Sequence, residues 1–360
     1  MKRWKPEMSS SLEIIDLRSD TVTLPTDEML EALRSAELGD DVFREDPTVN
    51  ALEEMAASKL GKDAALLVTS GTQANLVSLM SNTKRGDMVL LEAESHIYWY
   101  EVGAISAVAG LFPWPIASAR GSLDPKDVQT TLRPKNIHFP DTTLVCIENT
   151  HNRHGGTVIT PRQIEAISEV VKTNDLHLYM DGARIFNAAA ALHTDVKTLT
   201  KHVDNLMFCL SKGLSCPVGS IIVGEAEFIA RARKTRKILG GGMRQAGIIA
   251  APGIIALEKM TQRLEDDHKN ARRLAEGLAH TVGIDVELQN VQTNIVYFDV
   301  HNLGITSEEF VSRLRDDGVL ALTRDRNKVR MVTHRGIERD HIDRTLNAVD
   351  DIARKLRSPT

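Results

Sequence analysis

The chain has 360 residues, a formal net charge of −5 and 42% hydrophobic residues, which is typical of a globular protein with one large and one smaller domain. Aromatic residues make up only 4% and no basic face is evident, which argues against nucleic-acid binding. The longest apolar stretch, Ile248 to Leu257, is too short to cross a bilayer. The three cysteines form no CxxC pair, which suits a reducing compartment. We therefore expect a cytoplasmic protein without a nucleic-acid or membrane partner.

The N-terminal part predicts a leader, an arm and two helices. Residues 1–11 are expected to form a disordered leader, and residues 14–21 a short polar arm. A helix is expected from the N-cap Thr26 to Ala36. After an irregular acidic loop at 39–47, a second helix is expected from Thr48 to its C-cap, Gly61.

From there strands and helices alternate, which predicts an α/β fold with a mostly parallel sheet covered by helices. The expected strands are residues 65–68, 88–91, 143–147, 176–180, 206–210 and 219–223. A long helix from about Pro252 to Leu278 is expected to lead into a smaller α+β domain. Its strands are predicted at 294–298 and 328–332, and its helices at 307–317 and 339–356. The predicted division is an arm at 1–25, a large domain at 26–263 and a small domain at 264–360.

A lysine follows one of these predicted strands directly. The apolar run from Leu206 to Leu210 ends at Ser211-Lys212-Gly213. Ligands bind at the carboxyl ends of strands in open α/β sheets, and a lysine there can form a Schiff base with a carbonyl. The motif alone also fits a surface lysine that opens a turn.

Two other strand ends carry polar residues. Ser70-Gly71-Thr72 lies between a strand and a helix, where it can bind a phosphate or serve only as an N-cap. Asp181 also follows a strand, and a buried carboxylate there needs a partner, either Arg184 or a protonated pyridine nitrogen. Lys212 follows Asp181 by about one crossover unit, so the two are expected on neighbouring strands. This set on consecutive parallel strands predicts pyridoxal 5'-phosphate as the cofactor.

This order is similar to that of fold type I pyridoxal-phosphate enzymes, and the chain resembles the threonine aldolases among them. The resemblance runs from about Ile14 to the C-terminus and is strongest up to Ala251. The motifs that carry it are Asp16-Leu17-Arg18-Ser19-Asp20-Thr21-Val22-Thr23, Gly39-Asp40-Asp41-Val42, Glu45-Asp46-Pro47-Thr48-Val49-Asn50, Ser70-Gly71-Thr72-Gln73-Ala74-Asn75, Asp181-Gly182-Ala183-Arg184-Ile185-Phe186-Asn187, Cys209-Leu210-Ser211-Lys212-Gly213-Leu214, Pro217-Val218-Gly219-Ser220 and Gly240-Gly241-Gly242-Met243-Arg244-Gln245.

The resemblance implies a role for each matching cofactor residue. Lys212 would bind the cofactor covalently, Asp181 would pair with its ring nitrogen, and Gly71 and Thr72 would hold its phosphate. His96 would stack on the cofactor ring and take part in proton transfer. Without the resemblance, a histidine in such a position would more often be structural.

The resemblance also implies a substrate site. Ser19, Arg184 and Arg330 would bind the substrate carboxylate, for which the arginine fork is well matched. His138 and Tyr100 would lie near the substrate hydroxyl. Taken alone, Arg330 is better explained as a solvated residue at a strand end and His138 as a structural histidine.

The resemblance further implies a homotetramer with active sites at a dimer interface. Arg244, Lys237 and the loop at 40–46 are candidates for parts that one subunit donates to another, and Arg244 and Arg184 for cofactor contacts. Two residues in that loop depart from the family pattern. Phe43 replaces a common tyrosine, and Arg44 replaces a glycine in a turn for which a positive φ is expected.

His151 and His154 form a pair that could suggest a metal site. No carboxylate or cysteine cluster accompanies them in the sequence. We interpret them as loop residues and expect no metal.

The predicted function is cleavage of L-threonine or L-allo-threonine to glycine and acetaldehyde by a retro-aldol reaction. A related pyridoxal-phosphate lyase that catalyses β-elimination, or an amino-acid racemase, is the alternative, because the same carbanion chemistry serves all three. A non-catalytic binding or regulatory protein on the same fold is a more remote alternative.

Overall fold

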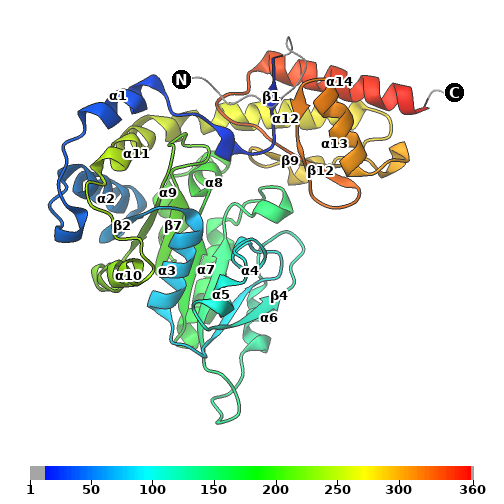
Figure 1. Ribbon diagram of the computed structural model, residues 1–360. Coiled ribbons are helices and arrows are strands. Elements are labelled where there is room, and N and C mark those ends of the chain that lie inside the picture. Colours follow the sequence, from blue (N-terminus) through cyan, green and yellow to red (C-terminus); the bar gives the residue numbers. More distant parts are fainter. Residues whose placement is uncertain (1–12, 358–360) are drawn as a thin grey trace. The chain divides into compact units, whose positions relative to one another are not determined.

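The computed structural model describes residues 13–357, so the leader expected at 1–11 lies outside the described residues. The chain divides into two compact units. The large unit runs from Leu24 to Leu264, and the small unit contains the arm up to Thr23 and the chain from Glu265 onward. Each unit is described by itself (Figure 1).

The large unit contains a seven-stranded sheet. Its strands, in spatial order, are β2 (Ala64–Val68), β8 (Ser220–Gly224), β7 (Asn205–Cys209), β6 (His177–Asp181), β5 (Thr142–Glu148), β3 (Met88–Glu92) and β4 (Phe112–Ile116). The five strands β7, β6, β5, β3 and β4 run parallel to one another, which confirms the predicted mostly parallel sheet.

Strand β8 runs antiparallel to both of its neighbours, β7 and β2. The short connection between β7 and β8 has no room for a crossover, so the chain must return in the opposite direction. β2 consequently runs in the same direction as β7, and the carboxyl ends of β2, β7, β6, β5 and β3 meet at one edge. The expectation that the phosphate turn, Asp181 and Lys212 follow consecutive parallel strands is wrong for the phosphate turn, because the antiparallel β8 separates β2 from β7 and β6.

The edge strand β4 has the sequence Phe-Pro-Trp-Pro-Ile and was not predicted. Proline lacks the N–H that a central strand must donate, so such a sequence fits only an edge. The inner strands β3, β7 and β8 are buried at every residue. Their continuous apolar sequences follow from burial on both faces of the sheet.

Helices cover the sheet of the large unit (Figure 1). They are α1 (Asp27–Ser35), α2 (Pro47–Leu60), α3 (Gly71–Asn82), α4 (His96–Trp99), α5 (Ala104–Ala107), α6 (Pro125–Thr131), α7 (Pro161–Thr173), α8 (Ile185–Ala191), α9 (Val196–Thr200), α10 (Ala226–Ile238) and α11 (Gly247–Lys259), with 3-10 turns η2 (Asp41–Phe43), η3 (Asn152–His154) and η4 (Met260–Arg263). Thr26 caps α1 by accepting a hydrogen bond from the Met29 N–H, and Gly61 ends α2 in the left-handed conformation, as predicted.

The single long helix predicted from Pro252 to Leu278 is wrong. The chain forms α11, then η4, and then α12 (Leu264–His280). Pro252 lies inside α11 rather than at its start. At the break, the Thr261 hydroxyl donates to the Leu257 carbonyl, and such side-chain bonds compete with the helical backbone pattern.

Apolar side chains pack on both faces of the large sheet. Leu66 and Met207 belong to one hydrophobic cluster, while their sequence neighbours Leu67 and Leu206 belong to the other. Side chains alternate between the faces of a strand, so each inner strand contributes to both clusters. Because the inner strands are buried on both faces, the strand ends that carry the polar residues are fixed in position.

The small unit has a three-stranded antiparallel sheet and a two-stranded parallel one. Its elements are β1 (Ile15–Asp16), η1 (Asp20–Val22), α12, η5 (Leu288–Asn290), β9 (Ile295–Asp299), η6 (His301–Leu303), α13 (Ser307–Asp316), β10 (Val319–Leu320), β11 (Leu322–Thr323), β12 (Lys328–Val332) and α14 (Arg339–Arg357). The arm is built into this unit, because Leu17 donates its N–H to Leu320 and accepts from Val332. Within residues 13–357, no helix combines the length and hydrophobicity needed to span a membrane.

Candidate active site

Asp181 and Lys212 lie at the carboxyl ends of neighbouring strands. Asp181 is the last residue of β6, and it is paired in register with Met207 of β7. Lys212 follows just after the end of β7, in a turn closed by a hydrogen bond from the Ser215 N–H to the Lys212 carbonyl. The adjacency of the two strands, predicted from the spacing, is confirmed.

The Asp181 carboxylate is buried, with 2% exposure, and held in a fixed orientation. Its Oδ1 accepts from the Ala183 N–H at 3.0 Å, and its Oδ2 accepts from Asn75 Nδ2 at 2.8 Å. The same Asn75 amide nitrogen donates to Glu101 Oε1 at 2.6 Å, and its Oδ1 accepts from the Tyr179 hydroxyl at 2.7 Å. Asn75 therefore bridges two buried carboxylates, and Tyr179 sets its orientation.

His96 begins helix α4 beside this network. Its ring Nδ1 lies 3.0 Å from Glu101 Oε1, and its ring stacks on Tyr100. Its backbone N–H donates to Glu148 Oε2 at 2.6 Å. A ring nitrogen of His96 and one oxygen each from Glu101 and Asp181 lie within 4.8 Å of one another. The imidazole retains 29% exposure, so it is both anchored and accessible.

The charges around His96 determine its protonation. Burial lowers the pKa of His96, but the hydrogen bond to Glu101 and the charges of Asp181 and Glu148 outweigh burial and the opposing charge of Lys212, so the net pKa is raised. Burial raises the pKa of Glu101, and its hydrogen bond to His96 opposes that shift. The pair forms a proton-holding site next to the Asp181 carboxylate.

The turn at Ser70-Gly71-Thr72 opens helix α3 at the same sheet edge. The Ser70 hydroxyl caps the helix by accepting from the Gln73 N–H, which leaves the first backbone amides, those of Gly71 and Thr72, directed out of the helix start. A Cβ at Gly71 would lie 3.0 Å from Cys209 Sγ of β7. The absence of a side chain therefore lets the helix start lie against the lysine strand.

These residues have the chemistry that pyridoxal 5'-phosphate requires. A phosphate can bind at the start of α3. A buried carboxylate, Asp181, can hold a protonated ring nitrogen, and the amine of Lys212 can bind the aldehyde. The donor set therefore fits the predicted cofactor.

Comparison with known proteins agrees with this geometry. The sequence matches the Beta-eliminating lyase family over residues 16–301. It is 41% identical to low-specificity L-threonine aldolase 1 of Arabidopsis thaliana, with 96% of this chain and 98% of that protein covered. It is 42% identical to the low specificity L-threonine aldolase of Escherichia coli, with 91% and 96% covered. The chain belongs to the threonine aldolases of the Beta-eliminating lyase family.

Solved structures share the fold of this threonine aldolase family member. A threonine aldolase of Leishmania major aligns with a TM-score of 0.82 at 19% identity, over 94% of this chain and 99% of that one. A putative L-allo-threonine aldolase of Listeria monocytogenes aligns with a TM-score of 0.77 at 19% identity, over 90% and 92%. The predicted fold type I architecture is confirmed. An alanine racemase of Cochliobolus carbonum is a further relative in sequence, 33% identical over 94% of this chain and 87% of that protein.

Arg184 and Arg244 occupy different environments in this threonine aldolase fold. Arg184 precedes helix α8, only three residues after Asp181, and is buried. The exposed Arg244 forms an ion pair with Asp40 at 3.1 Å. Lys237 lies near the same segment, because a Cβ at Gly242 would lie 2.9 Å from its side chain.

Ser19 and Arg330 belong to the small unit. The Ser19 hydroxyl caps η1 by accepting from the Thr21 N–H. Arg330 is on β12, and its Nη1 donates to the backbone carbonyl of Arg18 at 3.1 Å. The structure therefore brings Arg330 next to the arm that carries Ser19.

His138 does not join this set within one chain. It lies in the exposed segment 133–141, where its N–H donates to Asn136 Oδ1. This segment precedes the amino end of β5, whereas Asp181 and Lys212 lie at the carboxyl ends of their strands. A strand of seven residues spans roughly 20 Å. His138 therefore lies apart from Asp181 and Lys212 in the large unit.

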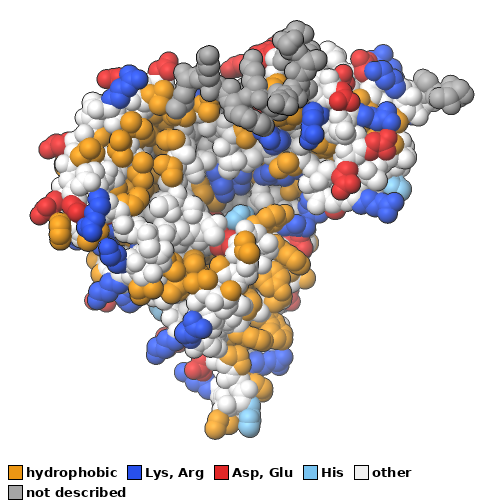
Figure 2. Space-filling view, in the orientation of Figure 1, with side chains coloured by type: hydrophobic (Ala, Val, Ile, Leu, Met, Phe, Trp, Pro, Cys, Tyr) orange, Lys and Arg blue, Asp and Glu red, His pale blue; other side chains and the backbone are white. Residues whose placement is uncertain are grey.

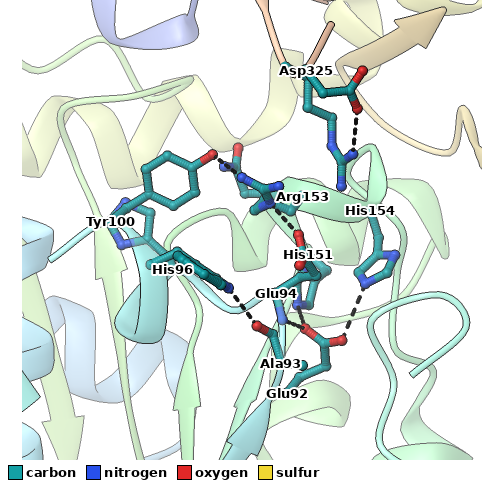
Figure 3. A network of polar contacts seen from close by, with 12 residues as sticks. Glu92, Ala93, Glu94, His96, Tyr100, His151, Arg153, His154 and Asp325 are labelled. Carbon is teal, nitrogen blue, oxygen red and sulfur yellow. Dashed lines mark hydrogen bonds and ion pairs between the residues drawn. The ribbon is translucent and has the colours of Figure 1, made fainter. Parts of the chain in front are cut away.

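Tyr100 stacks on His96 and connects it to a charged loop. The Tyr100 hydroxyl accepts from Arg153 Nη1 at 2.8 Å, and Arg153 Nε donates to Glu94 Oε2 (Figure 3). The resemblance implies a site role for Tyr100 but none for Arg153. No local pattern indicates Arg153, because its partners lie far from it in the sequence.

The expectation that no carboxylate accompanies His151 and His154 is wrong. Glu92, at the end of β3, lies against both imidazoles (Figure 3). The parallel pairing of β3 with β5 brings the ends of these strands together, although they are distant in sequence.

The loop with the two departures from the family pattern forms the 3-10 turn η2, whose C-cap is Arg44. Arg44 has φ 62° and ψ 32°, so this position does require the left-handed conformation expected for the usual glycine. Phe43 is exposed, with 69% of its surface accessible.

Proposed function

We propose that this chain is a pyridoxal 5'-phosphate-dependent carbon–carbon lyase that cleaves L-threonine and L-allo-threonine to glycine and acetaldehyde. The observation that carries the proposal is the adjacency of Asp181 and Lys212, beside His96, at the carboxyl edge of the sheet. Whole-length similarity to low-specificity threonine aldolases supports the substrate.

Three groups of the large unit would hold the cofactor. Lys212 would bind it covalently, Asp181 would keep its ring nitrogen protonated, and the amides of Gly71 and Thr72 would bind its phosphate. When bound, pyridoxal phosphate supplies an electron sink for the pair left by the broken carbon–carbon bond. The bridge from Asn75 fixes the orientation of the Asp181 carboxylate.

The substrate carboxylate is assigned to arginine. Arg184 is buried close to Asp181 in the sequence and would bind the carboxylate through its planar fork. We retain Ser19 and Arg330 of the small unit as further carboxylate ligands, and Arg244 as a cofactor contact supplied by a second subunit. Fixing the carboxylate orients the substrate so that its Cα–Cβ bond is the one that breaks.

His96 is the proposed base. Its imidazole takes the proton from the substrate hydroxyl as acetaldehyde leaves, and Glu101 stabilises the resulting imidazolium. Tyr100 holds the ring by stacking and lies near the hydroxyl. His138 assists only if a second copy of the chain places it there. The amine of Lys212 would hold the cofactor again once the product has left.

The central test is Lys212→Ala, with Lys84→Ala as a matched control at an exposed lysine. Glycine and acetaldehyde are measured from L-threonine and L-allo-threonine, with and without added pyridoxal phosphate. We expect Lys212→Ala to lose about 10³-fold or more of the activity and Lys84→Ala to retain it. Cleavage by Lys212→Ala at the wild-type rate would contradict the assignment.

The alanine racemase relative favours racemisation as the second candidate activity. Formation of D-alanine from L-alanine, without glycine from threonine, would establish it. Pyruvate and ammonia from serine would instead indicate β-elimination. A visible-edge absorbance band that shifts on addition of amino acid would exclude a non-catalytic binding protein.

We also propose a cytoplasmic homotetramer. Large hydrophobic side chains remain exposed on the large unit (Figure 2), and contiguous exposed apolar surface marks association sites. They include Leu38, Phe43, Trp99, Val102, Phe112, Trp114 and Ile238. The three cysteines are free and buried, which suits a reducing compartment. Light scattering should give the mass of four chains, and a monomer would refute the assembly.

A further inference from the structure

Glu92, His151 and His154 form a compact cluster in the large unit, separate from Asp181 and Lys212. Glu92 ends strand β3, His151 precedes the η3 turn, and His154 ends that turn. Figure 3 shows both imidazoles directed at the same carboxylate. One ligand atom from each residue lies within 4.8 Å of the other two. This cluster is not used in the proposed reaction.

The separations within the cluster match those of ligands around one ion. His151 Nε2 lies 2.9 Å from Glu92 Oε2, and His154 Nε2 lies 3.3 Å from Glu92 Oε1. Nitrogen and oxygen ligands at about 2.0–2.2 Å from zinc are themselves about 3–3.5 Å apart. Each imidazole nitrogen therefore already lies near such a distance from a Glu92 oxygen, and the ligand atoms of all three residues lie within 4.8 Å of one another.

His151 is the observation that points most directly to a ligand. Its side chain is 0% exposed, and among the described residues neither ring nitrogen makes an aligned hydrogen bond, despite the short distance from Nε2 to Glu92. A buried imidazole without such a bond is costly. A metal ion bound to Nε2 would satisfy the nitrogen that faces the carboxylate.

The surroundings hold the potential ligands in place. The Glu92 carboxylate accepts from Ser118 Oγ at 2.9 Å and from the Glu94 N–H at 2.6 Å. Each of these bonds holds one Glu92 oxygen, Oε1 by Ser118 and Oε2 by the Glu94 N–H. Such outer contacts orient metal ligands and tune their affinity.

Gly121 and the His151 backbone fix the imidazole ring. A Cβ at Gly121 would lie 2.6 Å from Cγ of His151, so the Gly121 backbone contacts the ring closely. The His151 N–H donates to the Thr157 carbonyl at 2.9 Å. His154, at 17% exposure, provides the side from which an ion can enter.

We propose that Glu92, His151 and His154 bind one divalent transition-metal ion of the Zn²⁺ class, with water as the remaining ligand. Two imidazoles and one carboxylate suit zinc better than Mg²⁺ or Ca²⁺, which prefer oxygen ligands. The ion would join the loop after β5 to the end of β3. Arg153 lies in that loop and donates to Tyr100, so the ion would also steady the residue stacked on His96.

The test uses the full chain purified with its cofactor, freed of metal with a chelator, and Zn²⁺ measured by equilibrium dialysis without amino acid. The variants are His154→Gln, a partly exposed position, and Glu92→Gln, which retains the shape of the side chain. His177→Gln is the control, because His177 is an exposed histidine paired with Asp204 elsewhere. Circular dichroism verifies that each variant is folded.

We expect wild type and His177→Gln to bind one Zn²⁺ per chain and to gain thermal stability from it. Both cluster variants should bind more than about tenfold more weakly and lose the thermal shift. Cobalt(II) should give a visible absorption band in wild type that is absent in His154→Gln. Absence of bound Zn²⁺ in wild type, or equal affinity in the folded cluster variants, would overturn the site.

Discussion

Two histidines of the large unit lie against buried carboxylates, but their accessibility differs. His96 contacts Glu101 and keeps 29% exposure, whereas His151 contacts Glu92 and has none. His96 begins a helix and stacks on a tyrosine, so one face of its ring is open to a ligand. His151 is enclosed by the loop and by Gly121. The same pair of residue types therefore suits proton transfer in one place and a fixed ligand in the other.

The environments of the two carboxylates also differ. Glu101 shares its oxygen between His96 and Asn75, and burial raises its pKa. Glu92 lies beside two imidazoles and has its pKa lowered overall. A carboxyl group with a raised pKa can share a proton with His96, while the Glu92 carboxylate faces the nitrogens of two imidazoles. The difference follows from how many cationic partners each carboxylate has.

Replacing the open histidine should have the largest effect on activity. We expect His96→Ala to lower kcat/KM for L-threonine by about 10²–10⁴-fold, because the base for the hydroxyl proton is removed. The exposed control His177→Gln should remain within a few fold of wild type. Steady-state glycine release measures both variants. An unchanged rate in His96→Ala would contradict the assignment of His96 as the base.

Crowding the enclosed histidine should have the largest effect on stability. We expect Gly121→Ala to lower the free energy of unfolding by about 2–4 kcal/mol, because the new Cβ meets the His151 ring and φ is +83°. Gly86→Ala is the control, since φ is +93° but nothing lies within 4 Å of the added Cβ.

Urea denaturation with a constant m-value gives both stability changes. The Gly86 variant should lose only about 1–2 kcal/mol, from backbone conformation alone. Equal losses at the two glycines would mean that the His151 ring adapts without cost, and that it is not held rigidly.

Neutralising the carboxylate beside His96 should shift a pH profile. The net pKa of His96 is raised because Glu101 and the other acidic groups outweigh burial and Lys212. A base must be unprotonated to act, so kcat/KM rises as pH rises through this pKa. Glu101→Gln removes the charge, lowers the pKa of His96, and should move the acidic limb of the profile to lower pH. A limb that moves to higher pH would contradict the assigned pair.

Much of this arrangement could be predicted from the sequence where local patterns determine structure. Strand ends identified Lys212 and Asp181, and the cap at Ser70 identified the start of α3. The contacts of Glu92 with His154, 62 residues apart, and of Tyr179 with Asn75, 104 residues apart, have no local signal. They depend on which strands become neighbours.

The wrong predictions about the fold also arise where local sequence does not determine the structure. Strand β4 was not predicted because it contains two prolines, and proline argues against a strand unless the strand is at the edge of a sheet. The continuous helix after Pro252 was wrong because its break at Met260 has no strong sequence signal. The strand order placed β8 between β2 and β7, which a list of strands in chain order does not reveal.

The smallest expected effect is a change in stability at Arg44, where backbone strain can be tested apart from any histidine contact. Arg44 adopts φ 62°, a conformation that costs a side-chain-bearing residue about 1–2 kcal/mol and costs glycine little. Because glycine also loses more chain entropy on folding, Arg44→Gly should raise the free energy of unfolding by about 0.5–1 kcal/mol. Arg44→Ala removes the same guanidinium but keeps the Cβ, so it should give no gain. Equal stability of the two variants in urea would show that the side chain, rather than the backbone conformation, sets stability at this turn.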